Sequence, residues 1–138
     1  MRRLFLGLLC VVLAGCGSDK TTGPDVDLSF VGTYHLRTIN GSNLPYTLAQ
    51  SGSVSLQIVA DAITIADGGT WSESGTQKTT ANGQTSTDVY GDNGTWIRSG
   101  NSIALHSSIY NNTAYSGTFS GSALTLTDAF PLTYVFNR

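Results

Sequence analysis

The stretch Val31-Gly32-Thr33-Tyr34-His35-Leu36-Arg37-Thr38-Ile39-Asn40 shows the pattern on which the fold of this chain depends. Tyr34 and Leu36 fall on one side of an extended backbone, and His35 and Arg37 fall on the other. Alternation of apolar and polar residues predicts a β-strand with one buried face. We therefore expect a strand here that buries Tyr34 and Leu36.

A Gly-Thr-aromatic triplet from this stretch recurs along the chain. Its four copies are Gly32-Thr33-Tyr34, Gly69-Thr70-Trp71, Gly94-Thr95-Trp96 and Gly117-Thr118-Phe119. Glycine lets the backbone bend or approach closely, threonine favours a strand, and the aromatic residue has a large surface to bury. No segment shows a helical stripe. We predict an all-β fold of about eight to ten strands, either a single antiparallel up-and-down β-barrel or a strongly curled meander, since closure removes exposed edges.

The expected interior consists of the large apolar residues on one side of these strands. They are Tyr34, Leu36, Val54, Leu56, Ile58, Ile63, Ile65, Trp71, Trp96, Ile103, Leu105, Tyr115, Phe119, Leu124, Leu126, Leu132, Tyr134 and Phe136. Such a set is sufficient for one core. Its aromatic members Tyr34, Trp71, Trp96, Tyr134 and Phe136 either line a ligand cavity or fill the interior.

The first 15 residues have the three regions of a signal peptide. Arg2 and Arg3 are followed by an apolar run over residues 4–13, which as a helix would span about 15 Å, half of a bilayer core. The run ends in Leu13-Ala14-Gly15-Cys16, which resembles the lipobox of bacterial lipoproteins. This resemblance implies that residues 1–15 are removed and that Cys16 carries acyl chains, palmitate among them, that anchor the protein in a membrane. The alternative is an ordinary secretory signal with an incidental cysteine.

The residues after Cys16 indicate location and domain organisation. Gly17, rather than Asp, follows the cysteine, which by the sorting rule of enteric bacteria favours the outer membrane, on its periplasmic or surface side, over the inner membrane. Residues 16–27 are polar and read as a flexible linker, and residues 28–138 form the predicted barrel domain. Residues 16–138 contain five Lys or Arg and nine Asp or Glu, which gives them a formal charge of −4. This balance excludes a nucleic-acid partner.

Both ends of the predicted domain resemble the small lipocalin-like group of the calycins. Residues 31–41 followed by Leu44-Pro45 resemble the openings of uncharacterised bacterial lipoproteins of this kind, as does the ending at residues 132–136. In that group a Gly-x-aromatic of the first strand packs beneath a basic residue of the last. The resemblance implies that Gly32 and Tyr34 lie beneath Arg138.

Two regions are candidates for function. Residues 41–51 carry Leu44, Pro45, Tyr46 and Leu48, which we expect in a loop or short helical turn that acts either as a ligand lid at the barrel mouth or as a hydrophobic plug. Residues 76–89 are polar around Asn82-Gly83, a type I′ turn signal. They predict a hairpin that either contacts a partner or is a solvated ribbon.

The sequence lacks a recognisable catalytic or metal-binding constellation. His35 and His106 fall on outward faces, and Glu73 is the only glutamate. We therefore expect no enzyme activity, no metal and no cofactor. The sequence predicts a membrane-anchored, non-catalytic binding module for a small apolar ligand or an envelope component. The alternative is a packed structural or protein-interaction barrel, such as an inhibitor, without a ligand cavity; the oligomeric state is open.

Overall fold

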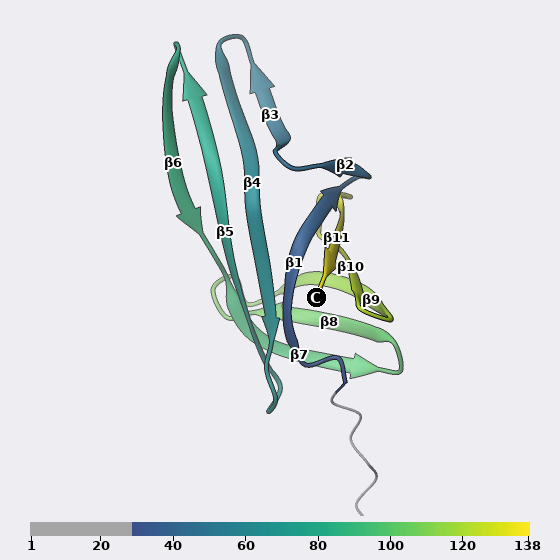
Figure 1. The fold of residues 1–138 in the computed structure, drawn as a ribbon. Coiled ribbons are helices and arrows are strands. Elements are labelled where there is room, and N and C mark those ends of the chain that lie inside the picture. The colour runs from purple at the N-terminus through teal and green to yellow at the C-terminus, as the bar shows by residue number, and fades with distance from the viewer. Residues whose placement is uncertain (1–28) are drawn as a thin grey trace, which may run out of the picture.

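Eight antiparallel strands close into a barrel in the computed structural model, which describes residues 29–138 (Figure 1). The barrel follows chain order through β1, β4, β5, β7, β8, β9, β10 and β11, and it closes because β1 pairs with both β4 and β11. The predicted all-β, up-and-down barrel is thus confirmed. Within residues 29–138 there is no helix that is long and apolar enough to cross a membrane.

The strands of the described part of the chain fall into a barrel set and an additional set. β2, β3 and β6 lie outside the closed barrel. The bounds are β1 (Gly32–Ile39), β2 (Ser42–Asn43), β3 (Tyr46–Ser51), β4 (Val54–Ile65), β5 (Thr70–Ala81), β6 (Gln84–Tyr90), β7 (Asn93–Ser99), β8 (Ser102–Ser107), β9 (Thr113–Ser120), β10 (Ala123–Thr127) and β11 (Thr133–Asn137).

A four-stranded extension projects from one end of the barrel (Figure 1). β4 and β5 have 12 residues each, and the parts beyond the barrel pair with β3 and β6 in the order β3-β4-β5-β6. The predicted hairpin around Asn82-Gly83 is the β5–β6 part of this extension, and both turn residues have positive φ, as a type I′ turn requires. Val54, which we expected in the core, is instead 45% exposed because it lies on this extension.

The interior of the barrel is filled with side chains. Its core consists of Phe30, Tyr34, Leu36, Ile39, Ile58, Ile63, Ile65, Trp71, Ile103, Leu105, Phe119, Leu124, Leu126 and Phe136. Twelve of these were expected from alternation, whereas Phe30 and Ile39 were not. The expected residues Leu56, Trp96, Tyr115, Leu132 and Tyr134 are only half-buried.

Gly117 of β9 shows why this copy of the triplet contains glycine. A Cβ added to Gly117 would lie 1.9 Å from the carbonyl oxygen of Thr125 on the neighbouring strand β10. No side chain fits in that space, so only glycine lets the two backbones approach here. The same triplet then buries Phe119, which is 7% exposed.

Residues 29–31 cross one end of the barrel, which we call the closed end. Phe30 inserts there, with its ring 5.1 Å from that of Trp96 in a T-shaped contact and 5.3 Å from that of Phe119. The guanidinium of Arg98 lies 4.1 Å from the centre of the Phe30 ring. Phe30 is 4% exposed and thus seals this end.

Arg138 ties the crossing segment to the last strand. Its guanidinium lies 5.1 Å from the Tyr34 ring, and its side chain runs past Gly32. Nη1 donates to the carbonyl of Val31 at 3.2 Å, and Nη2 donates to that of Ser29. The Tyr34 hydroxyl donates to the carbonyl of Phe30. The basic residue and the Gly-x-aromatic that carry the lipocalin resemblance are therefore side by side at the closed end.

The closed end predicts a large effect for one substitution. Phe30→Ala removes a buried ring and leaves a cavity, so it should lower the free energy of unfolding by about 3–5 kcal/mol in chemical denaturation. Phe130→Ala is the matched control: Phe130 is 76% exposed, and its loss should change stability by no more than about 0.5 kcal/mol. Equal effects of the two substitutions would contradict the sealing role of Phe30.

Candidate binding site

The opposite end of the barrel is open, and the extension stands above it. Here β1 and β10 end at Ile39 and Thr127, β11 begins at Thr133, and β4 and β5 continue into the extension. Residues 41–51 pass over this end, but not as the loop or short helical turn that we expected. They form β2 and β3, because β1 pairs with β2 and the outer part of β4 pairs with β3 on both sides of a bulge at Leu48.

The predicted lid residues separate within this region. Leu44 and Tyr46 pack against the core, and Pro45 is exposed between them. Leu48 is 41% exposed and faces the open end. Leu44 and Tyr46 are therefore placed as a hydrophobic plug would be, whereas Leu48 is the residue placed as a lid would be.

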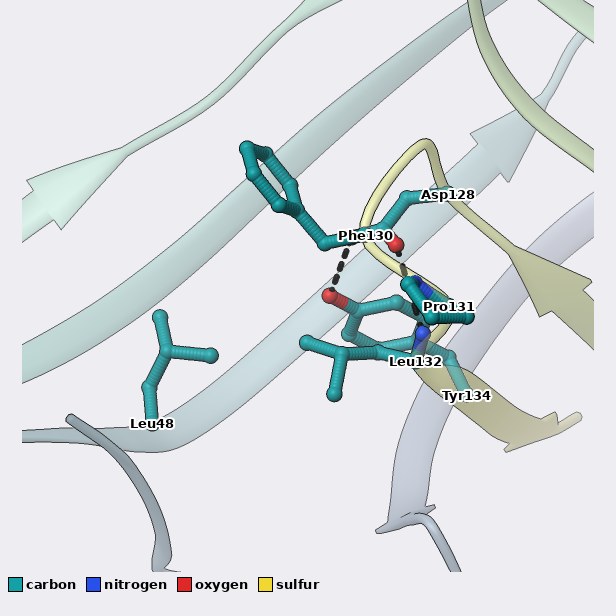
Figure 2. A pocket seen from close by; sticks show the side chains of 6 residues that line it. All are labelled: Leu48, Asp128, Phe130, Pro131, Leu132 and Tyr134. Carbon is teal, nitrogen blue, oxygen red and sulfur yellow. Dashed lines mark hydrogen bonds between the residues drawn. The ribbon is translucent and has the colours of Figure 1, made fainter.

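An apolar cavity of about 450 Å³ lies beside Leu48 (Figure 2). It is lined by Leu48, Asp128, Phe130, Pro131, Leu132 and Tyr134. Figure 2 shows Leu48 on one side and the residues of the β10–β11 loop on the other. Phe130 is 76% exposed, so a large aromatic surface borders the cavity without being covered.

Asp128 fixes the loop that carries Phe130. Its carboxylate accepts a hydrogen bond from the Tyr134 hydroxyl at 2.8 Å and one from the backbone N–H of Leu132 at 3.5 Å. Asn40, at the end of β1, exchanges hydrogen bonds of 2.7 and 2.8 Å with the backbone of Thr133. The cavity wall is thus held from both ends of the loop.

A pair of carboxyl groups lies deeper, at inward positions. Asp61 is opposite Gly75 and Glu73 is opposite the core residue Ile63, so Glu73 borders the apolar core and Asp61 lies two residues further along β4 toward the extension. Asp61 is 7% exposed and Glu73 is half-buried. Tyr115 donates to Glu73 Oε1 at 2.7 Å, and Tyr90 donates to Asp61 Oδ2 at 3.1 Å.

Gly75 makes the contact between Tyr90 and Asp61 possible. Asp61, Gly75 and Tyr90 occupy one row across β4, β5 and β6. A Cβ on Gly75 would come within 2.1 Å of the Tyr90 ring, so the ring crosses β5 over the space that glycine leaves. Tyr90 thereby reaches a carboxylate two strands away.

Burial controls the charge of this pair. It raises the pKa of the Glu73 carboxyl to about 8, and the charge of Asp61 beside it acts in the same direction. Burial also raises the pKa of Asp61, while hydrogen bonds with Glu73 and Tyr90 act in the opposite direction. The two carboxyl groups thus share a proton at neutral pH. Burial raises the pKa of Tyr90, Tyr115 and Tyr134 as well, so their hydroxyls stay donors.

Two further cavities adjoin the pair. One of about 270 Å³ is lined by Leu48, Ile58, Asp61, Gln77, Tyr90, Tyr115 and Tyr134. The other, of about 400 Å³, has Glu73 in its wall and shares Tyr90 and Tyr115 with the first. Leu48 and Tyr134 also line the apolar cavity of Figure 2. We refer to the three cavities together as the mouth.

The remaining predicted residues lie elsewhere. Tyr34, Trp71 and Phe136 are buried in the filled interior, Trp96 packs at the closed end, and only Tyr134 reaches the mouth. Cys16 lies outside the described residues. Within the part of the chain that the structure describes, no three His, Cys, Asp or Glu side chains gather as a metal site would require.

Asp61 and Glu73 were not identified from the sequence, although a signal was present. Glu73 is two residues after the inward Trp71, and Asp61 is two residues before the inward Ile63. In an alternating strand both positions face the core. An acidic residue at a position expected to be buried marks a candidate site, even where it belongs to no catalytic motif.

The sequence matches no protein-family model and no curated protein.

Glu73 predicts how stability depends on pH. Its pKa rises from 4.5 to about 8 on folding, so the folded state binds more protons between these values and stability should fall as pH rises through them. The slope is at most about 1.4 kcal/mol per pH unit, reduced by the water that reaches this half-buried group. Denaturation at several pH values should show a flatter profile for Glu73→Gln than for the native chain.

Asp67→Asn is the matched control for this measurement. Asp67 is exposed in the β4–β5 turn at the closed end, so its substitution should leave the slope unchanged. A Glu73→Gln profile as steep as the native one would show that Glu73 does not take up the proton.

Proposed function

We propose that this protein is a lipid-anchored lipoprotein of the bacterial cell envelope whose lipocalin-like barrel binds a small ligand with a large apolar part at its mouth. The uncovered apolar surface of Leu48 and Phe130 beside the cavity of about 450 Å³ carries the proposal. Uncovered apolar surface of this kind, next to a few fixed polar groups, is typical of a ligand site. The activity is binding, without catalysis.

The filled interior restricts where such a ligand sits. Tyr34, Leu105 and Phe136 are fully buried at the centre of the barrel, which supports a ligand site at the mouth and not deep inside. The ligand then contacts the β10–β11 loop and Leu48 of β3. Since Asp128 and Asn40 hold this loop, the site is largely formed before the ligand arrives.

The proposed anchor is Cys16, after removal of residues 1–15. The described domain begins at the closed end, where Ser29 is held by Arg138. Residues 16–28 thus join the barrel at the end opposite the mouth. On this proposal the acyl chains lie in the membrane, in the outer one by the sorting rule, and the mouth faces away from it.

Lipidation can be tested by metabolic labelling with radioactive palmitate in a bacterial host. The native chain should be labelled and Cys16→Ser should not, because the thiol is the only acceptor that the lipobox provides. Cys10→Ser is the matched control: Cys10 lies inside the part removed, so that variant should remain labelled. Label retained in Cys16→Ser would refute the anchor.

Binding at the mouth can be tested with the neutral fluorescent probe N-phenylnaphthylamine. The mature chain carrying Cys16→Ser, which needs no membrane, should increase the probe fluorescence. Phe130→Asp and Leu48→Asp should weaken binding about tenfold, because they place charge beside the apolar cavity. Ile97→Asp, at a 63% exposed position on the outer side of β7, should have no effect. Equal effects of all three substitutions, or no binding, would count against the mouth as the site.

A further inference from the structure

We propose that the ligand of the mouth carries a protonated amine, which binds between the Asp61 and Glu73 carboxyl groups and the surrounding tyrosine rings, while its apolar part lies against Leu48 and the β10–β11 loop. This inference depends on the proposed binding function and specifies the chemistry of the ligand. It follows from three features of the mouth, which are an oxygen without a fixed donor, aromatic walls and an excess of acidic groups.

The first feature is the Oδ1 atom of Asp61. This atom is buried, and no N–H or O–H group of the described residues donates to it. The donors around the pair are Tyr90, which bonds Oδ2 of Asp61, Tyr115, which bonds Glu73, the backbone N–H of Ala62, and the proton that the two carboxyl groups share. A buried carboxylate oxygen without a fixed donor is costly, so it marks a place for a donor from outside. Asp61 lines the cavity of about 270 Å³, which gives such a donor room.

The second feature is the set of three tyrosine rings around that cavity. Tyr90, Tyr115 and Tyr134 all line it, and the rings of Tyr115 and Tyr134 meet edge to face at 5.8 Å. Aromatic faces attract ammonium groups when water is excluded. The three tyrosine hydroxyls donate to Asp61, Glu73 and Asp128, and these hydrogen bonds orient the carboxyl groups. An incoming donor therefore binds to the carboxyl oxygens and not to the hydroxyls.

The third feature is the charge of the walls. None of the residues that line the three cavities is Lys, Arg or His. The titratable groups facing the carboxyl pair come from every neighbouring element: Tyr90 of β6, Asp92 after β6, Tyr115 of β9, and Asp128 and Tyr134 around the β10–β11 loop. All of them are neutral or negative, so the mouth attracts a cation and repels a carboxylate.

An ammonium group fits both the charge and the hydrogen bonds of the pair. Without ligand, Asp61 and Glu73 together hold one proton. An ammonium that donates to both carboxyl groups replaces this proton, which leaves to solvent, so the site then balances two carboxylates against one cation and keeps Tyr90 and Tyr115 as donors. Binding of an amine should therefore release protons and strengthen as pH rises toward 8.

The test compares hexylamine, hexanol and hexanoate, which share one apolar chain and differ in charge. Each is titrated calorimetrically into the mature chain carrying Cys16→Ser. Hexylamine should bind about tenfold or more tightly than hexanol, and hexanoate should bind weakest. Repeating the hexylamine titration in buffers of different ionisation enthalpy should show proton release at neutral pH, which hexanol should not produce.

Substitution of the carboxyl groups locates the amine. Asp61→Asn should reduce the affinity for hexylamine about tenfold and leave that for hexanol nearly unchanged. Asp67→Asn, at the closed end, is the matched control and should alter neither. Glu73→Gln should abolish the proton release. If Asp61→Asn does not fold, proton release by the unsubstituted carboxyl pair still decides the question.

The outcomes separate this inference from the binding function on which it depends. Equal affinities for hexylamine and hexanol, or tighter binding of hexanoate, would overturn the amine inference and leave the apolar mouth in place. Amine binding that Asp61→Asn does not weaken would also overturn it. Failure of N-phenylnaphthylamine and of all three hexyl compounds to bind would overturn both.

Discussion

The closure of the barrel depends on one strand, β1, which pairs with β4 on one side and with β11 on the other. The pairing with β11 joins residues about 100 positions apart, as between His35 and Asn137. Phe30 and Arg138 stabilise this closure at the closed end of the barrel. Phe30 packs against Phe119, and Arg138 donates hydrogen bonds to the backbone of residues 29–31. Tyr34, Leu36 and Ile39 of β1 belong to the core, so the packing of the barrel depends on this closure.

The length of β4 and β5 determines where the mouth lies. Both strands are longer than the barrel wall, and their outer parts need partners for their backbone groups. β3 and β6 satisfy that need and bring two side chains with them: Leu48 stands beside the apolar cavity, and Tyr90 reaches across Gly75 to Asp61. The four-stranded extension thus forms one wall of the mouth.

The barrel could be predicted from the sequence because its evidence is local and repeated. Alternation placed Tyr34, Ile63 and Leu105 in the core, and all three are fully buried. The site could not be predicted in the same way. A bulge at Val59 lets Ile58 and Asp61, three residues apart, face the same side, so simple alternation along β4 is interrupted at the point where the mouth begins. The approach of Phe130 to Leu48 depends on a loop and an edge strand far apart in sequence.

Asp61 and Glu73 contribute little to the fold that contains them. A pair of buried acids must keep a proton to avoid repulsion, and apolar residues of similar size at such positions are often neutral or stabilising. The chain nevertheless provides each of them with a tyrosine donor, and it leaves a glycine on β5 so that one of these tyrosines fits. Buried carboxyl groups that lower stability and yet have their own hydrogen-bond donors are typical of a functional site. Selection for packing alone would favour apolar residues at these two positions. The mouth, more than the filled interior, is therefore where the specificity of this barrel is expected to lie.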